Sequence, residues 1–156
     1  MLNNITTVGF FEHMTETDAK KIFDDTELDT IFCESQWFQP LIKMKKEGKI
    51  DSLQNIVLFG KVSADKNKQA TEVGLALHDF DEVVKLGETL AEVPFRESQP
   101  DDVYMLCYSS GTSGESKGVK LTHRNIFTTS IGVSQFIPTF SDDVYISYLP
   151  MSHQFE

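Results

Sequence analysis

Short apolar runs that alternate with helix-like stretches limit the fold of this 156-residue chain more than any other feature. Residues 28–33, 56–59 and 103–108 are three such runs, and each has the length of a buried strand. Strands that alternate with helices are typical of βα units, in which the strands pair in parallel. The sequence therefore predicts the α/β class, with βα units around a mainly parallel sheet in a single domain.

Three helices are predicted from apolar residues that recur at helical spacing. The first lies around residues 19–23 and the second around 38–42, where Pro40 is expected to delay the regular part. The third begins at Asp79, because Glu82 stands three residues later, as in a capping box. The apolar face of this third helix consists of Phe80, Val83, Val84, Gly87 and Leu90.

Polar stretches separate these elements. Residues 60–71 have no apolar period and are predicted to form a solvated loop. Residues 92–102 contain two prolines, which fit neither a helix interior nor a strand ladder, and are predicted to be a connector. Further on, residues 119–122 are expected to form a strand, a helix should begin near His123, and residues 143–148 predict another buried strand.

An excess of acidic residues limits the choice of partner. Asp and Glu number 24 against 14 Lys and Arg, so the formal charge is -10, and this charge repels nucleic acid and anionic lipid surfaces. The chain has no stretch of 18 consecutive apolar residues, and its first residues lack the basic and apolar regions of a signal peptide. We therefore expect no nucleic-acid partner and no membrane segment in this chain.

The two cysteines, Cys33 and Cys107, both lie in apolar runs, and no Cys/His cluster suggests a metal site. Free thiols in apolar surroundings fit a reducing compartment, so the sequence favours the cytoplasmic side. His13 and His78 have no neighbours in the sequence that would mark a site.

Residues 109–118 carry the chemistry predicted for this chain. They contain three glycines, four serines, one threonine and one lysine. Backbone N–H groups next to glycine can approach an anion closely, and hydroxyls with an ammonium group complete its shell, so polyphosphate is the natural ligand. Such a composition also fits a flexible surface turn. However, a loop at the carboxyl end of a buried parallel strand lies where open α/β sheets bind their ligands.

This loop differs from two common nucleotide-binding motifs. A Walker P-loop needs Gly directly before its Lys and Ser or Thr directly after it, whereas here Ser116 precedes Lys117 and Gly118 follows it. The dinucleotide pattern G-x-G-x-x-G is absent as well. A GTPase or an ordinary P-loop ATPase is therefore disfavoured.

The twelve residues that begin at Tyr108 are Y-S-S-G-T-S-G-E-S-K-G-V, and L-T-H-R-N begins at Leu121. They resemble the signature of the adenylate-forming superfamily, Y-T-S-G-T-T-G-x-P-K-G-V followed by L-T-H-x-N. Ser109 and Ser113 replace threonine and keep its hydroxyl. Ser116 replaces a proline that would stiffen the loop.

A second segment, residues 148–156, resembles the Y-L-P-L-A-H-x-F-E segment of long-chain acyl-CoA synthetases. The resemblance implies that the chain is part of the large N-terminal domain of such an enzyme, without its C-terminal domain. It also places His153 near the acyl side of the active site. His123 and Asn125, in contrast, are interpreted as structural, because Thr122 before them fits a helix cap.

The resemblance implies a two-step reaction, in which a fatty carboxylate attacks the α-phosphate of ATP to form acyl-AMP and coenzyme A then displaces AMP. ATP, Mg²⁺ and coenzyme A are the implied cofactors, a fatty acid is the implied substrate, and some complete enzymes of this type associate with the endoplasmic reticulum or another membrane. The implied catalytic residues are Lys117 and His153. The implied ATP-binding residues are Ser109, Ser110, Gly111, Thr112, Ser113, Gly114, Lys117 and Gly118.

Three interpretations remain open at this point. The chain is part of an acyl-CoA ligase and inactive alone, or a small nucleotide-binding or regulatory module, or a catalytically dead interaction domain. Genomic sequence that continues after the codon for Glu156 into adenine-site motifs would favour the first. Titration of ATP into the purified chain would separate the second from the third.

Overall fold

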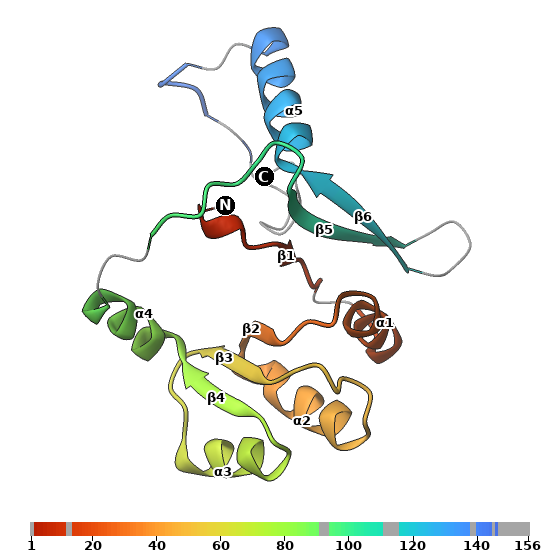
Figure 1. The fold of residues 1–156 in the computed structure, drawn as a ribbon, viewed down its shortest axis with the longest axis vertical. Helices are drawn as coiled ribbons and strands as arrows, with labels where there is room; N and C mark the ends of the chain where they lie inside the picture. The colour runs from red at the N-terminus through yellow and green to blue at the C-terminus, as the bar shows by residue number, and fades with distance from the viewer. Residues whose placement is uncertain are drawn as a thin grey trace. The chain divides into compact units, whose positions relative to one another are not determined.

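The computed structural model describes residues 2–11, 14–90, 94–110, 116–137, 140–144 and 146 (Figure 1). The chain forms two compact units. One is the continuous segment Thr15–Val93, and the other combines both ends of the chain, Met1–Met14 and Pro94–Glu156. Each unit has its own three-stranded sheet, so the predicted strands are divided between two sheets.

The Thr15–Val93 unit is built on a parallel sheet. Its strands are β2 (Thr30–Glu34), β3 (Asn55–Phe59) and β4 (Ala76–Asp79), in the order β2-β3-β4. The strands predicted at 28–33 and 56–59 are confirmed as β2 and β3, although β2 begins later than expected. The pattern missed β4, because this strand has only four residues and exposes Ala76 and His78 to solvent.

Helices precede and link these strands. They are α1 (Glu16–Thr26), the short 3₁₀ turn η2 (Ser35–Trp37), α2 (Phe38–Lys46), α3 (Ala64–Glu72) and α4 (Phe80–Thr89). The three predicted helices are confirmed as α1, α2 and α4. Asp79 caps α4 as predicted, since its carboxylate accepts a hydrogen bond from the backbone N–H of Asp81 at 2.9 Å. The capping box expected with Glu82 is not formed.

The prediction of a solvated loop at residues 60–71 is wrong. Helix α3 occupies most of this stretch and begins after Ser63, whose hydroxyl accepts the backbone N–H of Lys66. Ala70 is the one residue that α3 buries. A helix that reaches the core through a single alanine carries no apolar period, so its sequence resembles that of a loop.

The start of α2 also differs from the prediction. The helix begins at Phe38, two residues before Pro40, so the proline does not delay it. Proline fits the first helical turn, because N–H groups there have no partner within the helix.

The core of this unit lies against one face of the sheet, and Figure 1 shows α2 and α3 together on one side of that sheet. Ile56 and Leu58 of β3 are fully buried, and they alternate with residues that point to the other face. The largest fully buried side chains are Phe38, Ile22, Ile50, Leu53, Ile56 and Leu58. Burial of each such side chain contributes about 1.5–3 kcal/mol.

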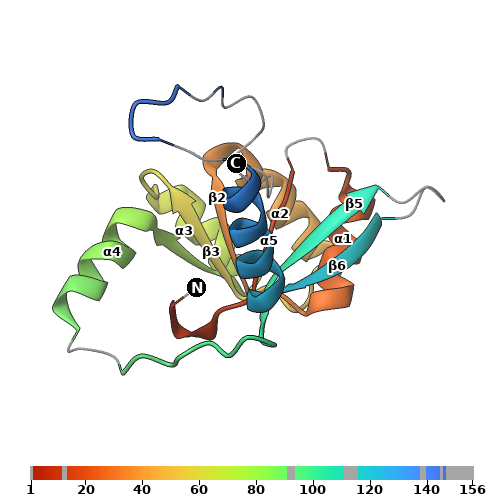
Figure 2. The ribbon, with the colours of Figure 1, turned by 90° about the horizontal axis from the view of Figure 1, so that it is seen from above.

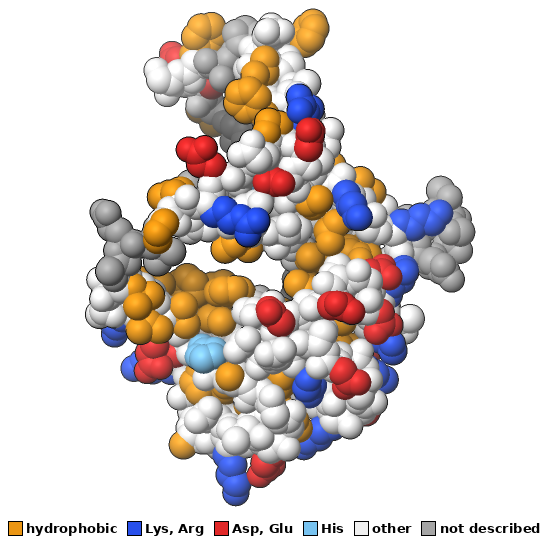
Figure 3. All heavy atoms as spheres, viewed as in Figure 1, with side chains coloured by type: hydrophobic (Ala, Val, Ile, Leu, Met, Phe, Trp, Pro, Cys, Tyr) orange, Lys and Arg blue, Asp and Glu red, His pale blue; other side chains and the backbone are white. Residues whose placement is uncertain are grey.

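The other face of this sheet carries aromatic side chains that remain half exposed. Phe32 is 53% and Phe59 is 50% exposed, and both rings contact Phe80 at the start of α4, with centroids 6.5 and 4.9 Å apart. Part of the predicted apolar face of α4 is exposed too, as shown by Val84 at 45% and Leu90 at 58%. Figure 3 shows apolar side chains gathered on the surface of this unit. Parallel sheets are usually covered on both faces, so burial here departs from the pattern that the sequence predicted.

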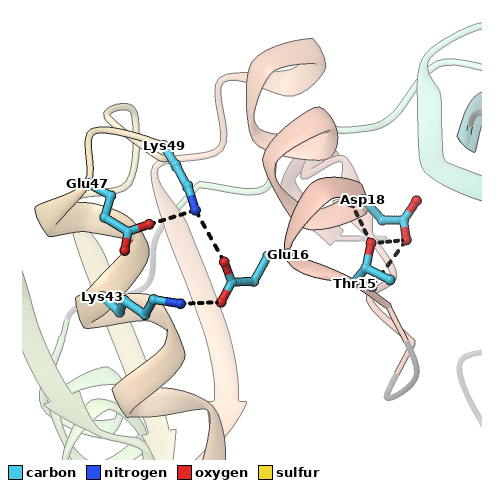
Figure 4. Close-up of polar contacts among 6 residues, drawn as sticks. All are labelled: Thr15, Glu16, Asp18, Lys43, Glu47 and Lys49. Carbon is cyan, nitrogen blue, oxygen red and sulfur yellow. Dashed lines mark hydrogen bonds and ion pairs between the residues drawn. The ribbon is translucent and has the colours of Figure 1, made fainter.

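Ion pairs join the start of α1 to the end of α2 (Figure 4). The Glu16 carboxylate accepts hydrogen bonds from Lys43 at 2.9 Å and from Lys49 at 3.2 Å. These two ammonium groups lower the pKa of the Glu16 carboxyl below its usual range. Their stabilising effect is therefore present above the ordinary pKa of glutamate and is lost as the pH falls through the lowered value. All three groups face solvent, so the effect on stability is small.

Cys33 and Cys107 are free cysteines. Cys33 is 8% exposed, and burial raises the pKa of its thiol to about 11. The thiol is therefore protonated at neutral pH, and it packs as a small apolar side chain, as its position in an apolar run predicts.

The unit formed by the two chain ends contains a mixed sheet. Its elements are η1 (Leu2–Asn4), β1 (Thr7–Val8), β5 (Val103–Ser110), β6 (Ser116–Thr122) and α5 (His123–Phe136). Strand β1 pairs parallel with β5, and β5 pairs antiparallel with β6 to form the hairpin seen in Figure 2. Three of the four strand pairs in the described residues are parallel, which confirms the predicted α/β class with mainly parallel pairing.

The strand predicted at residues 143–148 is not formed by the described part of that stretch. Asp143, Val144 and Ile146 belong to no strand, and Val144 is 94% exposed. The other three residues of the stretch lie outside the described residues. A strand needs a neighbour to pair its N–H and C=O groups, and none of the described strands pairs with this stretch.

Candidate site at the end of the β5–β6 hairpin

The candidate site is the end of the hairpin that β5 and β6 form. Antiparallel pairing continues through Ser109 opposite Lys117 and Ser110 opposite Ser116. Residues 111–115, which connect the strands, lie outside the described residues. The prediction of one loop across the whole Ser/Gly segment is therefore wrong at both ends, because ladder hydrogen bonds extend the strands into the polar sequence.

Strand β5 itself is confirmed, but its complete burial is not. Tyr108 is 5% exposed, whereas residues 103–107 are half buried. A continuous apolar run predicts cover on both faces of a strand. The apolar run does not show which residues pack against the two faces of the strand.

The structure locates four of the predicted ATP-binding residues, namely Ser109, Ser110, Lys117 and Gly118. We call the paired residues 109–110 and 116–118 the neck of the phosphate loop. The other predicted residues lie outside the described part of the chain, and they are Gly111, Thr112, Ser113, Gly114 and His153. The structure therefore brings Lys117 and Ser109 together and leaves the position of His153 a prediction.

Strand pairing divides the neck into two faces. Ser109 and Lys117 lie on one face, and Tyr108 and Gly118 lie on the other. Lys117 is exposed, so its ammonium group can reach a ligand in solvent. A lysine beside a serine hydroxyl and backbone N–H groups is a donor set that suits phosphate oxygens.

Tyr108 packs against Gly118 across the hairpin. A Cβ atom added to Gly118 would lie 2.9 Å from Cζ and 3.2 Å from the hydroxyl oxygen of Tyr108. Glycine is thus the residue that leaves room for this ring. Sequence reasoning missed the contact, because strand register, and not local spacing, places these two residues opposite each other.

Helix α5 begins at His123, as predicted, and Thr122 is its cap. The Thr122 hydroxyl accepts the backbone N–H of Asn125 at 3.2 Å, and the Asn125 side chain accepts the backbone N–H of Thr122 at 3.0 Å. This reciprocal pair is a capping box. It confirms that Asn125 is structural.

The connector before β5 is tied to the start of α5. Residues 94–102 contain no helix or strand, as predicted for this part of the connector. Arg124 donates two hydrogen bonds to the Asp101 carboxylate, at 2.9 and 3.2 Å. This guanidinium lowers the pKa of the Asp101 carboxyl below its usual range. Since both groups face solvent, the pair orients the connector more than it stabilises the fold.

His123 makes contacts that suit the predicted structural role. Its ring meets the Tyr104 ring edge to face, with centroids 5.3 Å apart. Its Nε2 atom is buried and has no hydrogen-bond partner among the described residues. A buried polar atom without a partner costs about 1–3 kcal/mol.

We therefore expect His123→Phe to keep or raise the melting temperature of the chain, because phenylalanine retains the ring contact and removes the unpaired nitrogen. His123→Ala should lower the melting temperature, since an aromatic pair contributes about 0.5–1.5 kcal/mol beyond its burial. Thermal unfolding of the three proteins measures both effects. An equal loss of stability in the two variants would show that Nε2 has a partner.

No group of three or more His, Cys, Asp or Glu side chains in the described residues is placed to hold a metal ion. Among the helices of the same residues, none is both long and apolar enough to span a membrane.

The described residues thus form an α/β fold in which exposed Lys117 stands across a strand pair from Ser109. The chain belongs to the AMP-binding enzyme family, whose family model matches residues 2–156.

Known relatives agree with this assignment. Fatty acyl-CoA synthetase B of Dictyostelium discoideum is 31% identical over 150 residues, which are 96% of this chain and 22% of that protein. Long chain acyl-CoA synthetase 5 of Arabidopsis thaliana is 37% identical over 110 residues, which are 67% of this chain and 16% of that protein. The chain thus spans a minor part of the length of the long-chain acyl-CoA synthetases that it matches.

A solved structure shows the same fold. The A domain of the carboxylic acid reductase from Segniliparus rugosus, determined in complex with AMP and a co-purified carboxylic acid, matches with a TM-score of 0.68. The match covers 96% of this chain and 26% of that one, at 16% sequence identity. The expected fold, part of the large domain of an adenylate-forming enzyme, is therefore confirmed.

Proposed function

We propose that this chain carries the ATP-phosphate-binding segment of an AMP-forming long-chain fatty acid–CoA ligase. The observation that carries the proposal is the neck, where exposed Lys117 lies directly across from Ser109. Membership of the AMP-binding family supports ATP as the nucleotide. The names of the relatives support a fatty acid as the second substrate, and the AMP and carboxylic acid in the solved A domain support the same pair of ligands.

In the proposed first step, a carboxylate oxygen of the fatty acid attacks the α-phosphorus of ATP. The bond from this phosphorus to the bridging oxygen breaks, and pyrophosphate leaves with the bonding electrons. In the second step the thiol of coenzyme A loses its proton and attacks the acyl carbon, and AMP leaves. The phosphate loop acts in the first step, when negative charge grows on the departing pyrophosphate.

Most of the predicted site residues have a role in this scheme. The Lys117 ammonium donates charge-assisted hydrogen bonds to the β- and γ-phosphates. The hydroxyls of Ser109 and Ser110, together with the loop at residues 111–114, supply further donors to the same oxygens. We assign His153 to the acyl side of the site, as the resemblance of residues 148–156 implies. We assign no protein ligand to the Mg²⁺ that accompanies ATP, and we place the site on the cytoplasmic side, as the free cysteines favour.

A titration of the purified, ¹⁵N-labelled chain tests the phosphate-binding role. We expect pyrophosphate and ATP to shift the amide signals of residues 109–118, and adenosine to leave them unchanged. Binding should be weak, because the chain matches only 22% and 16% of the length of its relatives and is expected to supply only part of the contacts to ATP. Shifts caused by adenosine alone, or no shifts at this segment with pyrophosphate, would contradict the proposal.

The chain by itself should form no acyl-CoA from ATP, Mg²⁺, palmitate and coenzyme A, because it matches only 22% and 16% of the length of its relatives. The contacts to adenine and coenzyme A are therefore expected to come from the parts of those relatives that this chain does not match. Acyl-CoA above the level of a control without protein would contradict this expectation.

A further inference from the structure

We infer that Tyr108 positions Lys117 for phosphate binding by packing its ring on Gly118. The inference rests on the proposed function and adds a residue that acts through the predicted ATP-binding residues. Tyr108 lies on the opposite face of the hairpin from Lys117. An effect of Tyr108 on phosphate binding therefore passes through the backbone of β6, which makes Tyr108 a positioning residue.

The ring of Tyr108 occupies the space that a side chain at position 118 would need. A Cβ atom added to Gly118 would lie 2.9 Å from Cζ and 3.3 Å from Cε1 of this ring. Tyr108 is 5% exposed, so its ring is held by close packing and cannot move aside as a surface group does. The backbone of β6 at Gly118 is thus seated on a buried aromatic ring.

This contact sets the position of Lys117. Gly118 pairs with Tyr108, and the adjacent Lys117 pairs with Ser109. A β6 strand pushed away from β5 would move the ammonium group relative to the Ser109 hydroxyl. Charge-assisted hydrogen bonds depend on such distances, so phosphate affinity should follow the fit between the ring and the glycine.

The first test measures the contact itself in the purified chain. Alanine in place of a strand glycine normally stabilises a protein when the backbone conformation suits it, and Gly118 is not among the glycines with positive φ. We nevertheless expect Gly118→Ala to lower the melting temperature (Tm) at which β5 and β6 unfold, because the new methyl group meets the ring. The NMR signals of these two strands, recorded at rising temperature, measure this Tm. In a Tyr108→Leu background, which lacks the distant ring atoms, the same change should lower the Tm less or raise it.

Gly132 in α5 provides the matched control for this cycle. A Cβ atom added there meets nothing within 4 Å. Gly132→Ala should therefore raise the Tm, as alanine does inside a helix. It should leave pyrophosphate binding unchanged.

The second test measures the pyrophosphate affinity of the folded variants, which a purely structural contact would not change. We expect Gly118→Ala and Tyr108→Leu to raise the Kd about fivefold or more, since small displacements of a binding group weaken its contacts strongly. Tyr108→Phe, which keeps the ring, should bind pyrophosphate more tightly than Tyr108→Leu does.

The outcomes separate this inference from the proposed function. Unchanged pyrophosphate affinity in both Gly118→Ala and Tyr108→Leu would overturn the positioning role. If Gly118→Ala does not fold, the affinity of Tyr108→Leu by itself decides between the outcomes. Equal Tm losses from Gly118→Ala with and without the Tyr108 ring would overturn the contact. If the unchanged chain binds no pyrophosphate, both the proposed function and the positioning role fail. The comparison of Tm values with and without the Tyr108 ring still tests the contact with Gly118.

Discussion

Lys117→Ala is expected to slow acyl-AMP formation roughly 10- to 150-fold in a complete acyl-CoA synthetase that contains these residues. The size of the effect follows from the loss of a charge-assisted hydrogen bond, which contributes about 1.5–3 kcal/mol. In the structure Lys117 is exposed at the neck and stands across from Ser109. Exchange of labelled pyrophosphate into ATP, with fatty acid present and coenzyme A omitted, measures this step alone.

Lys120→Ala is the matched control for this experiment. Lys120 is another exposed lysine of β6, but it pairs with Leu106 and lies on the opposite face from Lys117. Its removal changes the net charge by the same amount, so we expect an exchange rate close to that of the unchanged enzyme. Equal losses in the two variants would indicate a general effect of charge, and an unchanged rate in Lys117→Ala would refute its role.

Leu58→Ala is expected to lower the free energy of unfolding of the Thr15–Val93 unit by about 2–5 kcal/mol. Leu58 is fully buried in β3, between Cys33 of β2 and Asp79 of β4. The substitution removes buried apolar atoms and leaves a cavity that the packed core closes only in part. Domains of this kind are stable by only about 5–15 kcal/mol, so the loss is a large share of the total.

Urea unfolding followed by the fluorescence of Trp37 measures this loss. Trp37 is the single tryptophan of the chain and lies in η2, so its signal reports the Thr15–Val93 unit. Leu86→Ala is the control, because the Leu86 side chain in α4 is 60% exposed and its truncation should change stability by less than about 0.5 kcal/mol. Similar shifts of the urea midpoint in both variants would show that β3 is not the centre of the core.

Local signals were sufficient to predict where several elements begin. Asp79 caps α4 and Thr122 caps α5, because a cap needs only one side chain and an N–H group two or three residues away. The run at β3 was equally informative, since three of its residues are buried in succession. Each of these features depends on neighbours in the sequence.

Other features depended on contacts that no local pattern contains. Helix α3 was missed because Ala70 alone joins it to the core. The apolar spacing placed Val84 and Leu90 on one face of α4, yet both side chains are exposed in the structure. Exposure is a property of what packs against a helix, and spacing along the helix describes only one of the two partners.

The candidate site also combines features that the sequence predicts with features that depend on the tertiary structure. By itself, the sequence determined which chemical groups are available to a phosphate, because the signature from Tyr108 to Gly118 supplies the hydroxyls, the glycines and the ammonium group. Only the tertiary structure decided that Lys117 stands across from Ser109 and that the Tyr108 ring fills the space beside Gly118. The physical reason is strand register, since pairing across a hairpin sets which residues meet and which face each side chain takes.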